Sequence, residues 1–183
     1  MRDLSVTELD DRAIDLADRI GVRRFGPPPP FWIWAQSIGL AEHVEPLGAY
    51  CRNESNLPIR LRELSVLIVA RQHRSPFAWY AHYDGAIEAG VSREALDRLA
   101  AGEEPRFESE DEDVAFRFAD TLLNQHVIDD KLFAETSRIL GRDGLVDFLG
   151  CLGSFSMSAW GLNVFKLGIQ DGTPWPFPDT QPY

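Results

Sequence analysis

The sequence is poor in lysine and cysteine, and it contains no cluster of positive charge. Of its 18 cationic residues only Lys131 and Lys166 are lysines, and the formal net charge is −11. A partner such as nucleic acid or an anionic membrane surface requires a basic patch, so both classes of partner are excluded. The two cysteines, Cys51 and Cys151, lie far apart in the chain and belong to no CxxC or zinc-type spacing. We therefore interpret them as buried thiols in a reducing cytosol.

Signal-like, membrane-spanning and strand-like patterns are also missing. The N-terminus has no apolar run like that of a signal peptide, and no window approaches the length of a membrane span. We therefore expect a cytoplasmic protein with no membrane partner. No period-2 alternation persists, which predicts an all-α fold. His43 and His73 have no carboxylate or thiol at metal-ligand spacing, so the sequence predicts no metal site.

Helical periodicity and capping residues predict a bundle of about seven helices. With 183 residues, 44% of them hydrophobic, the chain can form one domain with a substantial core. The first helix is expected to begin near Ser5 and to stop at Gly21, and the proline run of residues 26–30 is expected to be extended. The remaining helices are expected within residues 31–51 (with a bend at Pro46), 55–74, 75–90, 92–102, 109–126, 129–141 and 144–169.

Two of these predicted helices carry an acid and a histidine in unusual surroundings. Glu63 shares its side of the helix with Val66, Leu67 and Ala70, so its carboxylate must find a partner or lose part of its hydration. His82 lies on a stripe of small residues and is flanked by aromatic side chains. Together they suit proton transfer. The alternative is a buried pair that only ties two helices together, and spacing alone leaves both interpretations open.

The order of these segments resembles the carboxymuconolactone decarboxylase family, which includes the alkylhydroperoxidase D proteins. The resemblance rests on "LRELSVLIVARQHRSPFAWYAHYDGAIEAGVS", on the acid-capped helix containing "FADTL", and on "LVDFLGCLGSFSMSAWGLNVFKLG". It covers roughly residues 30–170, which we take as a family-like core within a single domain spanning 1–183. Residues 1–29 then form an N-terminal helical arm with a proline-rich spacer, and residues 171–183 an extended Pro/aromatic tail.

The peroxidase branch of this family carries a Glu, eleven intervening residues and then Cys-x-x-Cys-x-x-x-His. On this chain the Glu corresponds to Glu63 and the His to His82, whereas the cysteine positions correspond to Ser75 and Ala78. Serine and alanine form neither a thiolate nor a disulfide, so the thiol redox cycle of that branch is lost. The chain is therefore identified as a cysteine-free, non-redox member, and an alkylhydroperoxidase-like antioxidant activity is disfavoured.

The decarboxylase branch works without a cofactor on a lactone that carries a second carboxylate. The resemblance thus implies a cofactor-independent decarboxylase or isomerase for a small organic acid or lactone. His82 would be the proton donor, and Glu63 would orient it or hold the second proton. Arg71 and Arg74 would clamp the substrate carboxylate, and solvated surface is the alternative for both. The other residues expected to contact substrate are Ser75, Ala78, Trp79 and Tyr83.

Members of this family commonly assemble as dimers, trimers or higher rings. The resemblance therefore implies a homo-oligomer, and small-residue helix faces together with the aromatic tail offer surfaces for a neighbouring subunit. A non-catalytic helical oligomer that binds a small ligand is the alternative to an enzyme.

Overall fold

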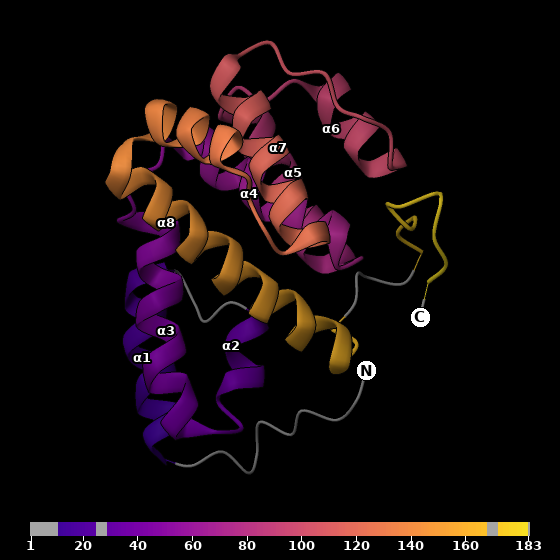
Figure 1. Cartoon of the computed structure of the whole chain (residues 1–183). Coiled ribbons are helices and arrows are strands. Elements are labelled where there is room, and N and C mark those ends of the chain that lie inside the picture. The colour runs from indigo at the N-terminus through magenta and orange to yellow at the C-terminus, as the bar shows by residue number, and fades with distance from the viewer. Residues whose placement is uncertain (1–10, 25–28, 168–171, 183) are drawn as a thin grey trace.

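The computed structural model of the protein describes residues 11–24, 29–167 and 172–182. Within these residues the chain forms eight helices and no strand, which confirms the predicted all-α fold. Figure 1 shows α1, α2 and α3 on one side and α4 to α7 on the other, with α8 crossing both groups. The helices are α1 (Asp11–Arg24), α2 (Pro29–Trp34), α3 (Ile38–Asn53), α4 (Ile59–Gln72), α5 (Pro76–Glu88), α6 (Arg93–Ala101), α7 (Glu110–Gln125) and α8 (Asp130–Val164).

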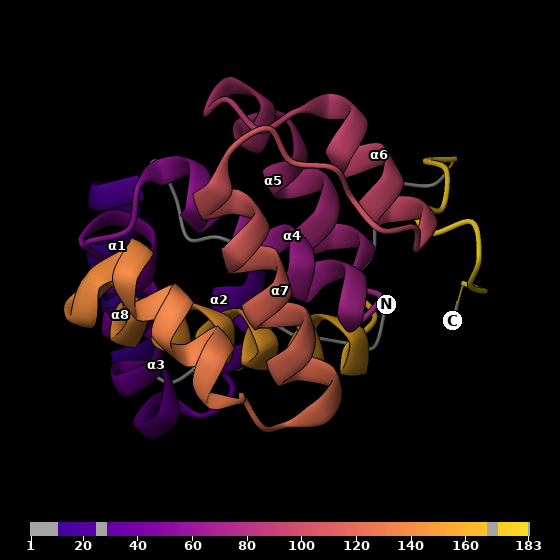
Figure 2. The ribbon, with the colours of Figure 1, turned by 45° about the horizontal axis from the view of Figure 1, so that its top comes forward.

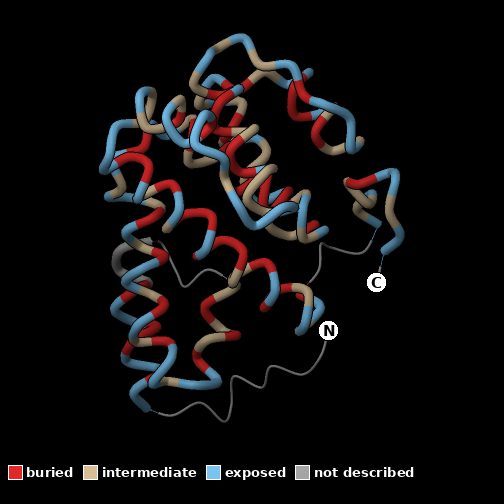
Figure 3. The backbone as a smooth tube through the Cα atoms, in the orientation of Figure 1, coloured by how far each residue is buried: buried red, intermediate tan, exposed pale blue. Residues whose placement is uncertain are grey.

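Helix α4 forms the centre of the bundle. Every residue from Leu64 to Ala70 is buried, because α5, α7 and α8 all pack against this helix. Figure 3 shows the buried positions running along α4 and along the side of α8 that faces it. A helix that is apolar nearly all round is expected to be enclosed by its neighbours. A carboxylate placed on α4, such as that of Glu63, therefore lies at the edge of the main core.

Helix α8 corrects one expectation about membrane spans. By length and composition it could cross a membrane, since an 18-residue window has a mean hydropathy of 1.3. The expectation that no sequence window approaches the length of a membrane span is therefore wrong. However, 56% of that window is buried inside the protein, as in the core helix of a soluble protein. The helix is also interrupted at Gly141, which lies where the two helices predicted over 129–141 and 144–169 meet.

Replacing Gly141 by Ala should lower the free energy of unfolding by about 1–3 kcal/mol, because its φ of 70° and ψ of 175° form a conformation that glycine alone adopts readily. The added methyl group would meet no heavy atom within 4 Å, so the cost is backbone strain. Gly150→Ala is the matched control: Gly150 is helical and equally open, and alanine should stabilise it by about 0.5–1 kcal/mol. Chemical denaturation measures the free energy of unfolding of both variants. Equal changes in Gly141→Ala and Gly150→Ala would contradict the interruption of α8 at Gly141.

The N-terminal region differs from its predicted form at two places. Helix α1 continues through Gly21 to Arg24, so the predicted stop at Gly21 is wrong. Residues 5–10 and 25–28, on which parts of these predictions fall, lie outside the described residues. Pro29 and Pro30 open α2 instead of being extended. Proline is tolerated in the first turn of a helix, because the N–H groups there have no partner within the helix.

The first three helices share an apolar cluster of their own. Helix α1 packs against α3, and the two lie side by side in Figure 1. The helix predicted over residues 31–51 is divided between α2 and α3 by a turn after Trp34, while Pro46 lies inside α3. The buried members of this cluster are Ala13, Leu16, Ala17, Ile20, Phe31, Ala35 and Ala41.

The aromatic tail packs on its own chain. Phe177 is completely buried and makes an edge-on contact with Trp79 of α5, their ring centres 5.5 Å apart. The hydroxyl of Tyr80 donates to the carbonyl of Pro174 at 2.9 Å, and Arg71 of α4 pairs with Asp179. Figures 1 and 2 both show the tail beside α6. Residues 172–182 thus pack on their own chain, and contact of the tail with a neighbouring subunit stays a prediction.

Candidate functional site

Glu63 of α4 and His82 of α5 are joined by a hydrogen bond. Nδ1 of His82 lies 2.7 Å from Oε2 of Glu63. Helices α4 and α5 make the most extensive contact of any described pair of helices, and the break at Ser75 turns the chain back so that they can. The backbone of α5 passes close to the carboxylate at Gly85, since Oε2 of Glu63 lies 3.5 Å from the point a Cβ of Gly85 would occupy. The acid and the histidine that the sequence singled out therefore meet.

The histidine borders a small cavity near the surface. The cavity has a volume of about 50 Å³, and His82 and Ala81 of α5 are among the residues that line it. The side chains of Glu63 and His82 are 25% and 24% exposed, so the pair is reachable from solvent without being fully hydrated. Most other walls are apolar, from Val66, Val69, Phe77, Phe155 and Leu162.

A cation that the sequence analysis missed also lines this cavity. Arg52 lies in the last turn of α3 and borders the cavity together with Ser158 of α8. Its guanidinium lies back along α3, with Nη2 3.3 Å from the point a Cβ of Gly48 would occupy. No local spacing connects Arg52 with His82, because only the packing of α3, α5 and α8 brings them to one cavity. Arg52, Ser158 and His82 thus line one and the same cavity.

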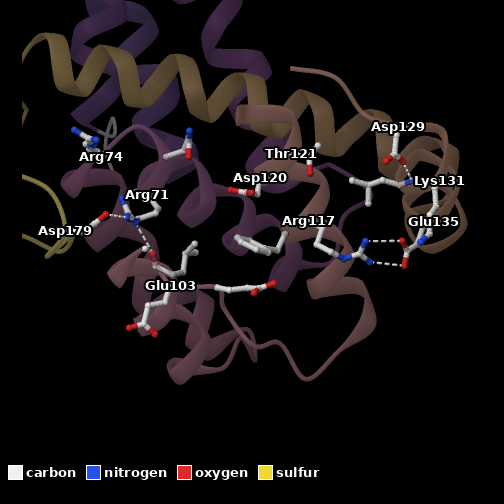
Figure 4. Close-up of a pocket in the computed structure, with 16 residues that line it drawn as sticks. Arg71, Arg74, Glu103, Arg117, Asp120, Thr121, Asp129, Lys131, Glu135 and Asp179 are labelled. Carbon is white, nitrogen blue, oxygen red and sulfur yellow. Dashed lines mark hydrogen bonds and ion pairs between the residues drawn. The ribbon is translucent and has the colours of Figure 1, made fainter. Parts of the chain in front are cut away.

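The two arginines predicted to hold a carboxylate lie elsewhere. Arg71 and Arg74 line a separate cleft of about 780 Å³, shown in Figure 4, and neither Glu63 nor His82 lines it. Nε of Arg71 donates to the carbonyl of Leu99 at 3.0 Å, and its guanidinium lies 5.5 Å from the ring centre of Phe177. Arg71 thus anchors the tail. Arg74 lies just after α4 and is exposed, which agrees with the alternative interpretation that it belongs to the solvated surface.

The wide cleft of Figure 4 is lined mainly by charged side chains, two pairs of which are ion pairs, Arg71 with Asp179 and Arg117 with Glu135. Arg117 holds Glu135 through two hydrogen bonds and Asp113 through a third. These bonds lower the pKa of Glu135, whereas burial raises the pKa of Asp120 in the same cleft. The cleft therefore combines both signs of charge and offers no acid–histidine pair.

Of the remaining predicted contact residues, only Ala78 lines the cavity beside His82. Ser75 is fully buried at the start of α5, and its hydroxyl finds no hydrogen-bond partner among the described residues. Trp79 is buried against the tail. Tyr83 donates to Asp97, and burial together with that bond raises the pKa of Tyr83. The structure thus does not bring Ser75, Trp79 and Tyr83 to this cavity.

Within the described part of the chain, no group of three or more His, Cys, Asp or Glu side chains is arranged to hold a metal ion. His73 is bonded at both nitrogens: Nε2 lies 3.1 Å from the hydroxyl of Ser156, and Nδ1 accepts from Trp160 at 3.2 Å. Burial lowers the pKa of His73, so its ring is neutral at pH 7. His73 therefore has a structural role.

Comparison with known proteins agrees with this fold. Residues 39–121 match the model of the Carboxymuconolactone decarboxylase family, a stretch that contains Arg52, Glu63 and His82. The structure is similar to an uncharacterized peroxidase-related protein from Silicibacter sp. TM1040, with a TM-score of 0.69. The two share 14% identity over 90% of this chain and 87% of that one, so the likeness concerns the fold alone. No curated protein sequence matches this one.

The family match supports the resemblance inferred from the sequence, but one part of that inference is wrong. The chain is not cysteine-free, because it contains the buried thiols of Cys51 and Cys151. The positions corresponding to the cysteine pair of the peroxidase branch remain Ser75 and Ala78. Any thiol chemistry of this protein must therefore come from a different place in the fold.

Proposed function

We propose that the protein is a cofactor-independent acid–base enzyme, of decarboxylase or isomerase type, that acts on a small organic acid or lactone. The observation that carries the proposal is the 2.7 Å hydrogen bond between His82 and Glu63 beside a cavity that Arg52 also lines. The family match supports an activity like those of the carboxymuconolactone decarboxylase and alkylhydroperoxidase proteins at the level of the family. A cytoplasmic homo-oligomer is part of the same proposal.

His82 is the group that moves the proton. With Nδ1 facing the carboxylate of Glu63, the ring presents Nε2 for substrate, and Nε2 has no hydrogen-bond partner within the described residues. The neutral ring accepts a proton at Nε2, and the protonated ring returns it to a carbanion or enolate carbon. Glu63 is a positioning residue: it fixes the orientation of the ring and stabilises the imidazolium.

Arg52 and the apolar walls supply the remaining requirements. A guanidinium binds a carboxylate through two parallel hydrogen bonds, which would orient a diacid or a carboxy-lactone toward His82. Loss of CO2 disperses negative charge, so apolar walls such as Val66 and Phe155 favour the transition state over the localised carboxylate. The cavity of about 50 Å³ is far below the few hundred Å³ usual for ligand pockets. The substrate is therefore very small, or it places only its reacting end there.

Arg52→Met should raise KM for a carboxylate-bearing substrate by about 10- to 100-fold, because a charged hydrogen bond to the substrate is lost. Arg71→Met is the matched control: Arg71 borders the other cleft, so KM should change less than about twofold while stability falls through the loss of the Asp179 pair. Steady-state kinetics on both variants measures this. A larger rise in KM for Arg71→Met than for Arg52→Met would restore the original assignment and contradict this one.

The proposal as a whole is tested by turnover of a panel of small keto acids, carboxy-lactones and unsaturated diacids. The protein should be dialysed against a chelator and assayed without added metal or cofactor, with CO2 release and uptake of solvent deuterium into product as readouts. We expect at least one compound to be turned over with deuterium incorporation. Binding of panel members without any turnover would instead identify a non-catalytic ligand-binding module.

A further inference from the structure

The fold brings the two cysteines of the sequence together. Cys51 lies in α3 and Cys151 in α8, and the sulfur of Cys151 lies 3.7 Å from the carbonyl oxygen of Cys51, to which it donates. The two thiols also interact electrostatically, since each one shifts the pKa of the other. Both are reduced and buried, with exposed fractions of 1% and 0%. The side chain of Cys151 thus contacts Cys51 directly, which places the two buried thiols side by side in the core.

The two sulfurs lie in unequal surroundings. The hydrogen bond from Cys151 lowers the pKa of Cys51 to about 7, against an opposing effect of burial. The Ser154 hydroxyl and the charge of Arg52 act in the same direction, and Asp147 acts against them. The same bond to Cys51, together with burial, raises the pKa of Cys151. Cys51 is therefore the more acidic thiol of the pair, which suits the nucleophile, and Cys151 suits the resolving partner.

A small cavity is lined by residues that flank Cys51 in α3. Its volume is about 20 Å³, and its lining includes Gly48, Arg52 and Ser154. Ser154 connects the two features, since it borders the cavity and its hydroxyl helps to lower the pKa of Cys51. A cavity of this size holds about one water-sized molecule. Hydrogen peroxide, with two heavy atoms, is only slightly larger, whereas an alkyl hydroperoxide exceeds this volume by several heavy atoms.

We propose that Cys51 and Cys151 form a redox-active dithiol that hydrogen peroxide oxidises to an intramolecular disulfide. The thiolate of Cys51 attacks one oxygen of the peroxide, the O–O bond breaks, and the leaving hydroxide takes a proton to become water. This forms the sulfenic acid of Cys51. The thiol of Cys151 then attacks that sulfur, a second water leaves, and the S–S bond forms. In sum, one peroxide and two thiols give one disulfide and two waters.

This site is distinct from the positions that carry cysteines in the peroxidase branch, which are Ser75 and Ala78 here. The disulfide would join α3 to α8 one residue before Arg52, and its formation does not depend on any role of His82. An external dithiol, such as dithiothreitol, returns the pair to the reduced state by exchange.

The experiment treats the reduced full-length protein with hydrogen peroxide, and then alkylates it in denaturant. We expect the intact mass of the oxidised, unalkylated fraction to fall by the mass of two hydrogens. Digestion should give a linked peptide that contains Cys51 and Cys151, and dithiothreitol should reverse the change fully. tert-Butyl hydroperoxide should react at least about tenfold more slowly, because it exceeds the cavity. Two alkylated cysteines after excess peroxide, a disulfide between chains, or equal rates with the two peroxides would overturn the proposal.

Single variants separate the two roles. In Cys151→Ser the sulfenic acid has no partner, so dimedone should label Cys51; in Cys51→Ser, Cys151 should stay unlabelled. Preferential labelling of Cys151 would contradict the assignment of the nucleophile. The wild-type mass measurement does not need either variant to fold, so it remains decisive if one of them does not. Ser154→Ala should slow oxidation of Cys51, since one donor to its thiolate is lost.

Discussion

His82→Asn should lower kcat/KM by about 10²- to 10⁴-fold on any substrate that the protein decarboxylates or isomerises, the usual contribution of a general acid or base. Asparagine keeps a side chain that can hydrogen-bond toward Glu63, but it cannot carry a proton to and from substrate. The fold should persist, because the side chain of residue 82 is only partly buried. Steady-state kinetics together with a thermal melt separates loss of chemistry from loss of structure.

The matched control is His126→Asn. His126 is exposed and closes α7 with a φ of 65°, a left-handed conformation that asparagine tolerates well. This second loss of an imidazole should leave both kcat/KM and the melting temperature nearly unchanged. Equal activity of the two variants, at a level close to that of the wild type, would mean that the Glu63–His82 pair only ties α4 to α5.

Phe177→Ala should lower the free energy of unfolding by about 3–5 kcal/mol, the range for truncating a fully buried phenylalanine. The ring is completely buried, contacts Trp79 and Trp175 edge-on, and lies under the guanidinium of Arg71. Its loss opens a cavity and releases the tail from α5. Chemical denaturation measures the change. The loss should not depend on protein concentration, because these contacts lie within one chain.

Phe133→Ala is the control for this change. Phe133 lies in the first part of α8 and is 54% exposed, so truncation should shift stability by less than about 1 kcal/mol. Two results would contradict the docking of the tail on its own subunit. One is a loss of stability in Phe177→Ala as small as that in Phe133→Ala, and the other is a loss in Phe177→Ala that grows when the protein is diluted.

The sequence predicted those features that depend on local pattern. Helical periodicity and the serine–proline break located α4 and α5, and their antiparallel return across that break placed Glu63 against His82. The interruption of α8 at Gly141 was also predicted, because a glycine near the end of a helical pattern indicates a helix end. Where local rules compete with packing, the sequence was less informative. Gly21 ends no helix: α1 continues to Arg24, and its preceding turns are held by the apolar cluster that it shares with α2 and α3.

The rest of the site depends on contacts between distant segments. Arg52 reaches the cavity through α3, and Cys51 meets Cys151 because α3 packs along α8. Arg71 and Arg74 follow Glu63 closely in sequence, yet they extend from the far end of α4 into the other cleft. Proximity in sequence was thus a poor guide to which arginine accompanies the histidine. The side chains that complete a cavity between helices come from whichever helices pack there.

A double-mutant cycle on kcat/KM tests most directly whether the imidazole and the carboxylate act as one unit. Glu63→Gln alone should reduce the rate by at least about tenfold, since glutamine cannot stabilise the imidazolium. If Glu63 acts through His82, the double variant Glu63→Gln/His82→Asn should be no slower than His82→Asn alone, within about twofold. Losses that simply multiply would show two independent residues and would contradict the pair.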